Sequence, residues 1–469
     1  MQLLYLLKNE WMLCFMIAVM LIMKVGDNGN GRSFWIRSFN GMMAVFCLLA
    51  WFLPTETGEA FGGMFIGYKA GAFAKNLLMT GALLIGLIAE DWMKQCRHIV
   101  EFYLLMLSTL LGMFFMISSG HLLMFYLSLE LASIPLAALA NFGLEERRSG
   151  EAAMKMILSS AFSSGVMLMG ISFIYGATGT LSFAQLTQTV QFEPVYIIGF
   201  VMLFTGIAFK LSVVPFHLWT ADVYEGSPVP VTAFLSVISK GATVIIFASI
   251  LYNVFGALHD TWYTLLYILS IATMITGNLF AIRQQNLKRF LAFSSITQIG
   301  FILIGLSGSS NEGIASTIYF ILVYLFSNIV AFGVISHVAA ETEKENIDDY
   351  KGLAKTNPFL AWSMAIALFS LAGIPPTAGF FGKIFLLKAG SGTGNFALII
   401  VAALNMIVAL YYYLRVIRAM FMDKNEHAIP ALKSGVSLKV ALFVCLAGIV
   451  FTGFAGSIYE YILGLQLGL

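Results

Sequence analysis

Charged residues are scarce in this chain. Asp, Glu, Lys and Arg make up 11% of its 469 residues, whereas soluble domains carry about 25%. Hydrophobic residues make up 59%, and the mean hydropathy is +0.88. Apolar runs of about 20 residues recur along the whole length, and each is long enough to span a bilayer as a helix. This composition excludes a soluble globular protein. It predicts an all-α, polytopic membrane protein in which residues 1–469 form a single membrane domain.

Cysteine is also rare, and its spacing excludes several kinds of site. The four cysteines (Cys14, Cys47, Cys96 and Cys445) include no CxxC pair, which suits neither an iron–sulfur cluster nor a disulfide scaffold. The sequence has no HExxH motif, no paired metal-ligand spacing and no nucleophile elbow. Its net charge of +2 gives no sign of a nucleic-acid partner. We therefore expect no metal, no cofactor and no redox or hydrolytic chemistry on this chain.

The apolar runs predict about fourteen membrane spans. The expected ranges are 9–25, 33–53, 70–89, 102–119, 121–141, 152–175, 195–219, 229–256, 261–281, 290–307, 313–340, 358–388, 394–420 and 436–466. We group them as N-terminal helices (1–101), a first five-span unit (102–256), a second five-span unit (261–420) and a C-terminal helix (436–466).

The basic residues predict the orientation of these spans. Of the 26 lysines and arginines, 18 fall in the loops after odd-numbered spans. Only Lys8, Lys69, Lys75 and Lys388 fall on the opposite side. Because cytoplasmic loops carry the excess of Lys and Arg, both termini are expected on the non-cytoplasmic side.

A few charged residues remain inside the predicted spans. They are Glu130, Lys155, Lys210, Lys240 and Lys383. A charge at the bilayer centre costs about 2.5–3.5 kcal/mol, so these side chains should face the bundle interior. A structural salt bridge to Glu130 could explain one or two of the lysines but not all of them. Lys155 lies only about four residues into its span and could instead extend its side chain to the cytoplasmic surface.

Prolines interrupt some spans. Pro135, Pro215, Pro375 and Pro376 lie well inside them. Proline removes a backbone N–H and frees a carbonyl, which lipid tolerates only where protein or water covers the break. We predict that spans seven and twelve are broken helices, at Pro215 and at Pro375–Pro376. These spans lie five apart, so spans four to eight and nine to thirteen are expected to form two inverted repeats, as in many transporters.

The buried charges and the breaks together suggest a proton path. Burial disfavours the charged form of a lysine, and an approaching carboxylate favours it. We expect a lateral row of proton carriers made of Glu130, Lys155, Lys210, Lys240 and Lys383. Whether Glu130 pairs with Lys210 or with Lys155 stays open. His217 is either a water-bridged relay or an interfacial residue held by a carbonyl. Hydroxyl groups are available at Ser159, Ser160, Ser163, Ser164, Ser294, Ser295 and Thr297.

Several stretches resemble one protein family. They are FKLSVVPFHLWTADVYEGSPVPVTAFLSVISKGA, LSLELASIP, NLKRFLAFSSITQIGF and LAGIPPTAGFFGK. They are similar to the subunit N family of bacterial NADH–quinone oxidoreductase (respiratory complex I), whose members are antiporter-like, proton-translocating membrane subunits. The resemblance covers essentially the whole chain. It implies the inverted repeats and both broken helices, and it assigns proton translocation to Glu130, Lys210, Lys240 and Lys383. Lys155 and His217 also match the family pattern.

The resemblance also implies a setting for the chain. It implies one subunit of a translocase, a proton-translocating NADH:quinone oxidoreductase in the bacterial inner membrane, next to membrane subunits M and K. FMN, iron–sulfur clusters and quinone reduction would belong to other subunits, while this chain would handle protons and internal water within the lipid bilayer. Two alternatives share the fold and the lysine pattern. One is a subunit of a multisubunit cation/proton antiporter, although the DVYEGSP loop disfavours this alternative. The other is the membrane arm of a hydrogenase-type complex.

Overall fold

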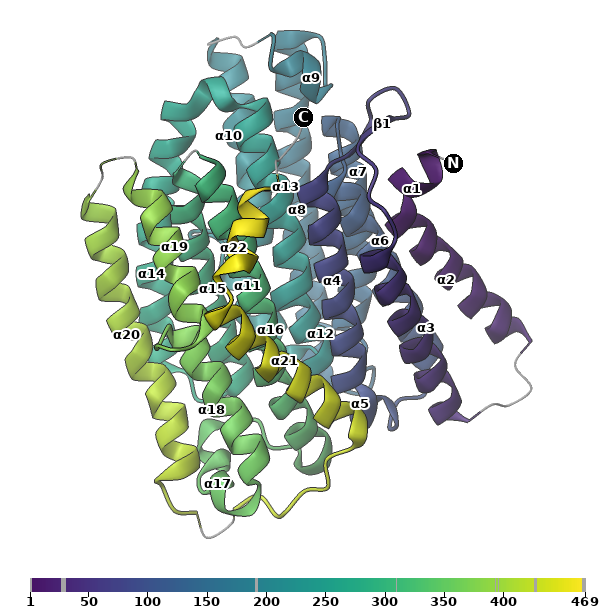
Figure 1. Cartoon of the computed structure of the whole chain (residues 1–469), viewed down its shortest axis with the longest axis vertical. Helices are drawn as coiled ribbons and strands as arrows, with labels where there is room; N and C mark the ends of the chain where they lie inside the picture. The colour runs from purple at the N-terminus through teal and green to yellow at the C-terminus, as the bar shows by residue number, and fades with distance from the viewer. Residues whose placement is uncertain are drawn as a thin grey trace.

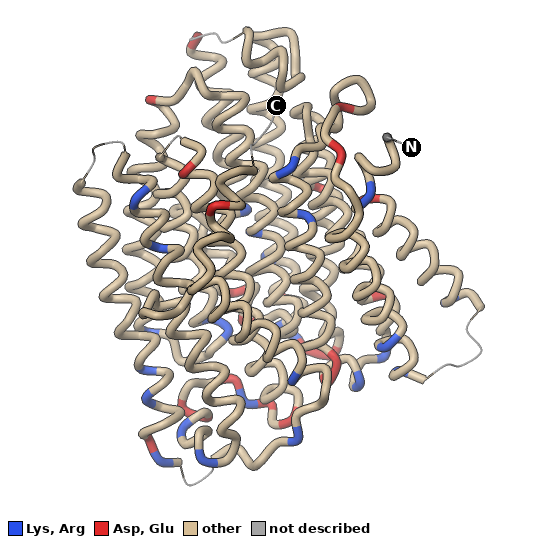
Figure 2. Tube along the Cα trace, viewed as in Figure 1, with Lys and Arg blue, Asp and Glu red and all other residues tan. Residues whose placement is uncertain are grey.

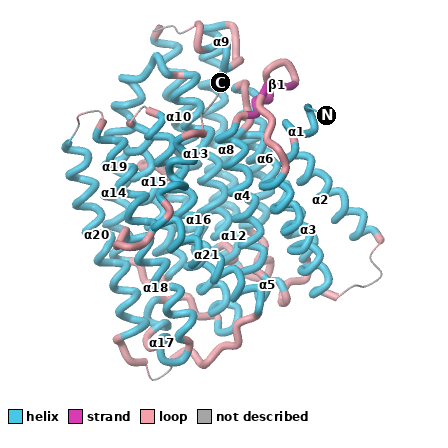
Figure 3. Tube along the Cα trace, in the orientation of Figure 1, coloured by secondary structure: helices cyan, strands magenta, loops and turns pink. Residues whose placement is uncertain are grey.

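The computed structural model describes residues 2–26, 31–189, 193–308, 310–392, 394, 396–425 and 428–465. These residues form an almost entirely helical bundle (Figures 1 and 3). Within them, twelve helical segments are long and apolar enough to cross a membrane. They are α3 (Arg32–Phe52), α4 (Lys69–Ile88), α6 (Ile99–Ile117), α7 (Leu122–Ala140), α8 (Arg147–Thr178), α10 (Pro194–Leu211), Val229–Val254, Gly256–Arg283, α15 (Leu287–Ser307), α16 (Asn311–Thr342), α20 (Phe396–Phe421) and α21 (Val436–Phe454).

Two of these segments are composite. Val229–Val254 consists of α12 (Val229–Phe234), the π-helical turn η1 (Leu235–Ser239), α13 (Lys240–Ser249) and a second π-helical turn, η2 (Ile250–Val254). Gly256–Arg283 joins η3 (Gly256–Leu258) to α14 (His259–Arg283).

The remaining predicted spans correspond to α2 (Lys8–Val25) and to the pair α18 (Pro358–Ala372) and α19 (Ala378–Ser391). The prediction of a polytopic helical membrane protein is therefore confirmed. The short elements are α1 (Gln2–Leu6), α5 (Glu90–Met93), α9 (Phe183–Leu186), α11 (Leu218–Gly226), η4 (Ile347–Tyr350), α17 (Leu353–Thr356), α22 (Gly456–Leu463) and the antiparallel strands β1 (Gly58–Ala60) and β2 (Phe65–Gly67). The predicted last span, 436–466, corresponds to α21 and α22, and residue 466 lies outside the described residues.

Both helix breaks fall where the prolines predict them. α10 ends at Leu211 and α11 begins at Leu218, with a cis peptide bond between Val214 and Pro215. α18 ends at Ala372 and α19 begins at Ala378, with a cis bond between Pro375 and Pro376. In contrast, α7 continues through Pro135 without a break.

The packing of the two five-helix units is similar at one close contact. A Cβ atom on Gly112 of α6 would lie 2.5 Å from the backbone nitrogen of Ala132 in α7. A Cβ atom on Gly277 of α14 would lie 2.5 Å from the hydroxyl of Thr297 in α15. Glycine thus lets the first two helices of each unit approach closely. The boundaries of the units and their inverted relation stay predictions.

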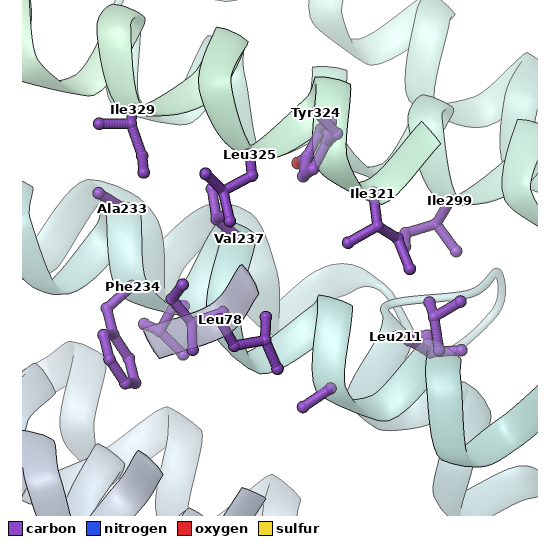
Figure 4. Close-up of a cluster of buried hydrophobic side chains, with 14 of the residues drawn as sticks. Leu78, Leu211, Ala233, Phe234, Val237, Ile299, Ile321, Tyr324, Leu325 and Ile329 are labelled. Carbon is purple, nitrogen blue, oxygen red and sulfur yellow. The ribbon is translucent and has the colours of Figure 1, made fainter. Parts of the chain in front are cut away.

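The centre of the bundle is formed by the Val229–Val254 segment, α15 and α16, which are buried on almost every side. Figure 4 shows part of this core, where Leu325 of α16 points toward Val237 and the ring of Phe234 extends away from α16. Helices such as α3, α8 and α20 bury only part of their surface and leave apolar faces outward, as helices in contact with lipid do.

Lysine and arginine gather at one end of the bundle, the lower end in Figure 2. α1 lies toward the opposite, upper end (Figure 1). The separation matches the charge bias in the sequence. The assignment of the basic end to the cytoplasm follows from the positive-inside rule and stays a prediction.

Candidate functional site

Lys210 lies in the last turn of α10, directly before the first break. Its Nζ donates to the hydroxyl of Ser133 in α7 at 2.5 Å and to the hydroxyl of Ser160 in α8 at 2.7 Å. Both acceptors are neutral. The contacts therefore satisfy two of the three hydrogen atoms of the ammonium group without neutralising its charge.

A small cavity adjoins Lys210. It has a volume of about 20 Å³, and its walls include Ser133, Ser160, Ser239 and Thr243. A cavity needs roughly 10–15 Å³ to hold one water molecule, which must also find polar partners. The space beside Lys210 meets both conditions. It extends from Lys210 toward Ser239, the residue that precedes Lys240.

Glu130 is part of α7, one turn before Ser133. Its Oε1 atom is buried and has no hydrogen-bond partner in the described part of the chain. Glu130 forms an ion pair with neither Lys210 nor Lys155, although its charge and that of Lys210 interact through space. In this conformation, Glu130 is therefore ion-paired with neither lysine.

The structure corrects the placement of Lys155. Its side chain is 42% exposed and forms ion pairs with Glu151 at 2.8 Å and with Asp222 of α11 at 2.7 Å. The reason is the length of α8, whose 32 residues extend past the apolar part of the span. Lys155 therefore belongs to a charged surface cluster that also contains Arg289, which lies 2.7 Å from Asp222. It is not a buried member of the row.

Lys240 is the most central of the lysines. It lies where the π-helical turn η1 passes into α13 and is 2% exposed. Its Nζ donates to the hydroxyl of Ser295 in α15 at 2.8 Å and lies 5.5 Å from the centre of the Tyr224 ring. These partners are also uncharged.

Lys383 is fully buried at the second break. Its Nζ donates to the backbone carbonyls of Leu371 at 2.8 Å and Ala372 at 3.1 Å. The break leaves these carbonyls without helical partners, so the lysine fills the place that a continued helix would have taken. The ammonium group also lies 4.9 Å from the Phe301 ring centre.

Hydrogen-bonded side chains connect the surroundings of Lys240 and Lys383. Ser294, the neighbour of Ser295 in the sequence, shares a hydrogen bond with the hydroxyl of Tyr413. Gln298 donates to the same tyrosine hydroxyl at 3.2 Å and to the carbonyl of Leu371 at 3.0 Å. Lys383 donates to that carbonyl too. Polar groups therefore line the route from Lys240 to Lys383, and this route passes from Ser295 to Ser294 across the backbone of α15.

His217 lies at the start of α11, two residues after Pro215. The side chain is buried, and neither ring nitrogen makes a hydrogen bond of good geometry with the described residues, although the imidazole interacts with the backbone of Pro215. Its ring centre is 6.4 Å from that of Phe280 in α14. A buried imidazole next to a helix break is the kind of group that a water molecule could join to the path.

The sequence analysis missed another set of buried charges. Lys75 of α4 was counted outside the spans and Glu10 of α2 was not counted among the charges within them, yet the side chains of Glu10 and Lys75 are 4% and 5% exposed and form an ion pair. Lys75 also donates to the hydroxyl of Ser118 at 2.5 Å. Lys8 is buried as well and donates to the carbonyls of Ala50 and Leu53. The available signal was that positions 10 and 75 lie inside the predicted spans 9–25 and 70–89.

Lys288 was likewise assigned to a loop but is buried at the basic end, where it lies 2.8 Å from Glu345.

Among the described residues, no group of three or more His, Cys, Asp or Glu side chains could hold a metal ion. The four free cysteines lie on separate helices or loops.

Comparison with known proteins shows the family. Residues 119–410 match the model of the family described as "NADH:quinone oxidoreductase/Mrp antiporter, TM". A protein of Azobacteroides pseudotrichonymphae named NADH-quinone oxidoreductase subunit N is 44% identical over 97% of this chain and 96% of its own length. This chain belongs to the subunit N family of NADH-quinone oxidoreductase.

Solved structures agree with membership of the subunit N family. A chain of respiratory complex I from Thermus thermophilus has 26% sequence identity and a TM-score of 0.80, covering 96% of this chain and 97% of the other. A chain of the Mrp complex from Dietzia superposes with a TM-score of 0.84 over 99% and 96% of the two chains. Its identity is only 20%, so this second likeness concerns the fold alone. The region matched by the family model contains both breaks and every residue of the predicted row.

Proposed function

We propose that this chain, as a membrane subunit of NADH–quinone oxidoreductase, moves protons across the membrane through a buried path that contains Glu130, Lys210, Lys240 and Lys383. The observation that carries the proposal is the kind of hydrogen-bond acceptor that surrounds the three lysines. Each is held by hydroxyl or carbonyl oxygens and none by a carboxylate. A buried lysine without a counter-ion has a strongly disfavoured charge, so it can release its proton more readily than an ion-paired lysine.

Each of these residues has a different role along the proposed proton path. Glu130 sets the proton affinity of Lys210 from a distance, and a closer approach would raise that affinity. Water in the cavity beside Lys210 would carry the proton toward Ser239 and Lys240. From there, the polar side chains around Ser294, Tyr413 and Gln298 offer a way to Lys383. His217 is a relay candidate at the first break.

The energy for transport would come from outside this chain. We propose that FMN, iron–sulfur clusters and quinone belong to other subunits of the enzyme, and that this chain carries no redox chemistry and acts within a translocase. Its neighbours would be subunits M and K in the bacterial inner membrane. Both termini would lie on the non-cytoplasmic side, as the charge distribution favours.

The proposal is tested with Lys383→Met in the intact complex, reconstituted into vesicles. Loss of a positioned proton carrier slows proton transfer roughly 100-fold or more, so this subunit's share of the protons pumped per NADH oxidised should disappear. Lys388→Met is a matched control, since Lys388 is on the same helix but 64% exposed. Unchanged pumping by an assembled Lys383→Met complex would contradict the proposal.

A cation/proton antiporter subunit is the second candidate, because the Dietzia Mrp chain has the same fold. It predicts sodium-dependent transport that quinone inhibitors do not affect. Pumping that requires NADH oxidation and stops with a quinone inhibitor would exclude it.

A further inference from the structure

An open groove lies between α18, α21 and the segment that precedes α21. Its volume is about 990 Å³, at the upper end of the range of roughly 300–1,000 Å³ that is usual for ligand sites. The N-terminal ends of both helices border it, so it lies at the end of the bundle where lysine and arginine gather (Figure 2). None of the residues proposed to carry protons lines it.

One wall of the groove is an apolar stripe on α21. Val440, Phe443 and Val444 are all exposed and are spaced three and four residues apart, which puts them on one face of the helix. The exposed ring of Phe359, in the first turn of α18, supplies the facing wall. In a membrane helix, such a face contacts acyl chains.

The mouth of the groove is basic. Lys433 precedes α21, and Lys439 lies in its first turns, directly before the apolar stripe. Neither lysine has an ion-pair partner within the ranges that the structure describes, and no acidic residue lines the groove. Asp91 approaches the neighbouring Gly435.

The carboxylate of Asp91 is already engaged elsewhere. It lies 3.1 Å from Lys94 and 3.0 Å from His337. Its ion pairs are thus made with Lys94 and His337, and not with Lys433 or Lys439.

We infer that this groove binds an anionic phospholipid, with its phosphate between Lys433 and Lys439 and its acyl chains along the α21 stripe. Charge complementarity selects this occupant. Two uncompensated ammonium groups end an apolar channel at the predicted cytoplasmic interface, and basic pockets between helices on that side suit anionic headgroups. Lysine side chains reach such headgroups while their stems stay on apolar surface. The inference is independent of proton transport.

The test uses the intact complex in phosphatidylcholine vesicles that contain a photoactivatable phosphatidylglycerol. After illumination, mass spectrometry measures labelling of residues 440–444. Removal of one lysine near an anionic lipid weakens binding about fivefold, so Lys433→Gln with Lys439→Gln should lower labelling about 30-fold when the probe is subsaturating. Arg283→Gln with Lys424→Gln removes two exposed charges from the same end, outside the groove, and should leave labelling unchanged.

A second variant keeps the test informative if the lysine variant does not assemble. Val440→Trp fills the apolar channel and should lower labelling while both lysines remain. A phosphatidylcholine probe should label the groove weakly and equally in the wild type and in the lysine variant. Equal labelling by the two probes in the wild type would overturn the inference, and so would labelling that ignores the lysines. Absence of label in the wild-type complex, because another subunit fills the groove, would overturn it too.

Discussion

Replacing Glu10 with alanine should destabilise this chain by about 3–5 kcal/mol, the usual consequence of leaving one member of a buried ion pair alone. The magnitude follows from the burial of the pair, whose side chains are only 4% and 5% exposed. Without the carboxylate, the ammonium group of Lys75 would retain the hydroxyl of Ser118 as its hydrogen-bond acceptor. One hydroxyl cannot compensate a positive charge between α2, α4 and α6.

A double substitution separates pairing from packing. Buried ion pairs are often replaced by apolar residues at little cost, so Glu10→Leu with Lys75→Met should recover most of the stability lost in either single variant. Lys94→Ala provides a matched control for a surface pair. Lys94 is 44% exposed and lies 2.9 Å from Glu90, and such pairs contribute about 0–1 kcal/mol.

The assay compares the amount of assembled complex in membranes and the temperature at which the detergent-solubilised complex loses half of its activity. The order of heat resistance should be the wild type, then Lys94→Ala, then the double variant, with each single variant of the buried pair last. A double variant as heat-sensitive as Glu10→Ala would refute the reasoning. A Glu10→Ala complex as stable as the Lys94→Ala control would refute it as well.

Two further predictions concern hydrogen bonds to charged groups. Ser295→Ala removes the hydroxyl that accepts from Lys240. Loss of a hydrogen bond to a charged group costs about 1.5–3 kcal/mol, so the ammonium form of Lys240 should be disfavoured and pumping per NADH should decrease in vesicles, while Ser295→Thr should retain pumping. Outside the membrane spans, hydrogen bonds from His337 and Lys94 hold the pKa of Asp91 below its usual value of 3.8. A depressed carboxyl pKa stabilises the fold above the usual value, and that contribution is lost as pH falls through the lower, folded-state pKa. The heat sensitivity of Asp91→Asn relative to the wild type should therefore shrink as the pH falls below about 4, and a difference that keeps growing in that range would contradict this sign.

The sequence predicted the features that depend on position along a span. Lys240 and Lys383 are too far from any loop to reach water, and they are 2% and 0% exposed. The prolines located both broken helices because a missing N–H weakens a helix, although α7 continues through Pro135.

Features that depend on helix length or on the facing side chain were harder to predict. The sequence left Lys155 between the buried row and the surface, and the length of α8, which continues past the apolar region, places it at the surface. Glu10 and Lys75 are separated by 65 residues, and no periodicity along one helix shows that two charges on different helices will meet. The same limit applies to the link from Ser294 to Tyr413, which joins residues 119 positions apart.

Lys383 closes the end of α18 with its own ammonium group, and this makes the shape of the helix depend on a proton. The carbonyl end of a helix carries a partial negative charge, and a cation there contributes about 0.3–2 kcal/mol. A neutral Lys383 would keep fewer donors and lose this attraction. Its hydrogen bonds to the carbonyls of Leu371 and Ala372 would then weaken, while Gln298 would still donate to the carbonyl of Leu371. Lys8 at the end of α3 uses the same contact. At the second break, however, the ammonium group that binds the end of α18 is also the group that is proposed to carry a proton. Each loss of that proton would therefore weaken the contact between Lys383 and the end of α18.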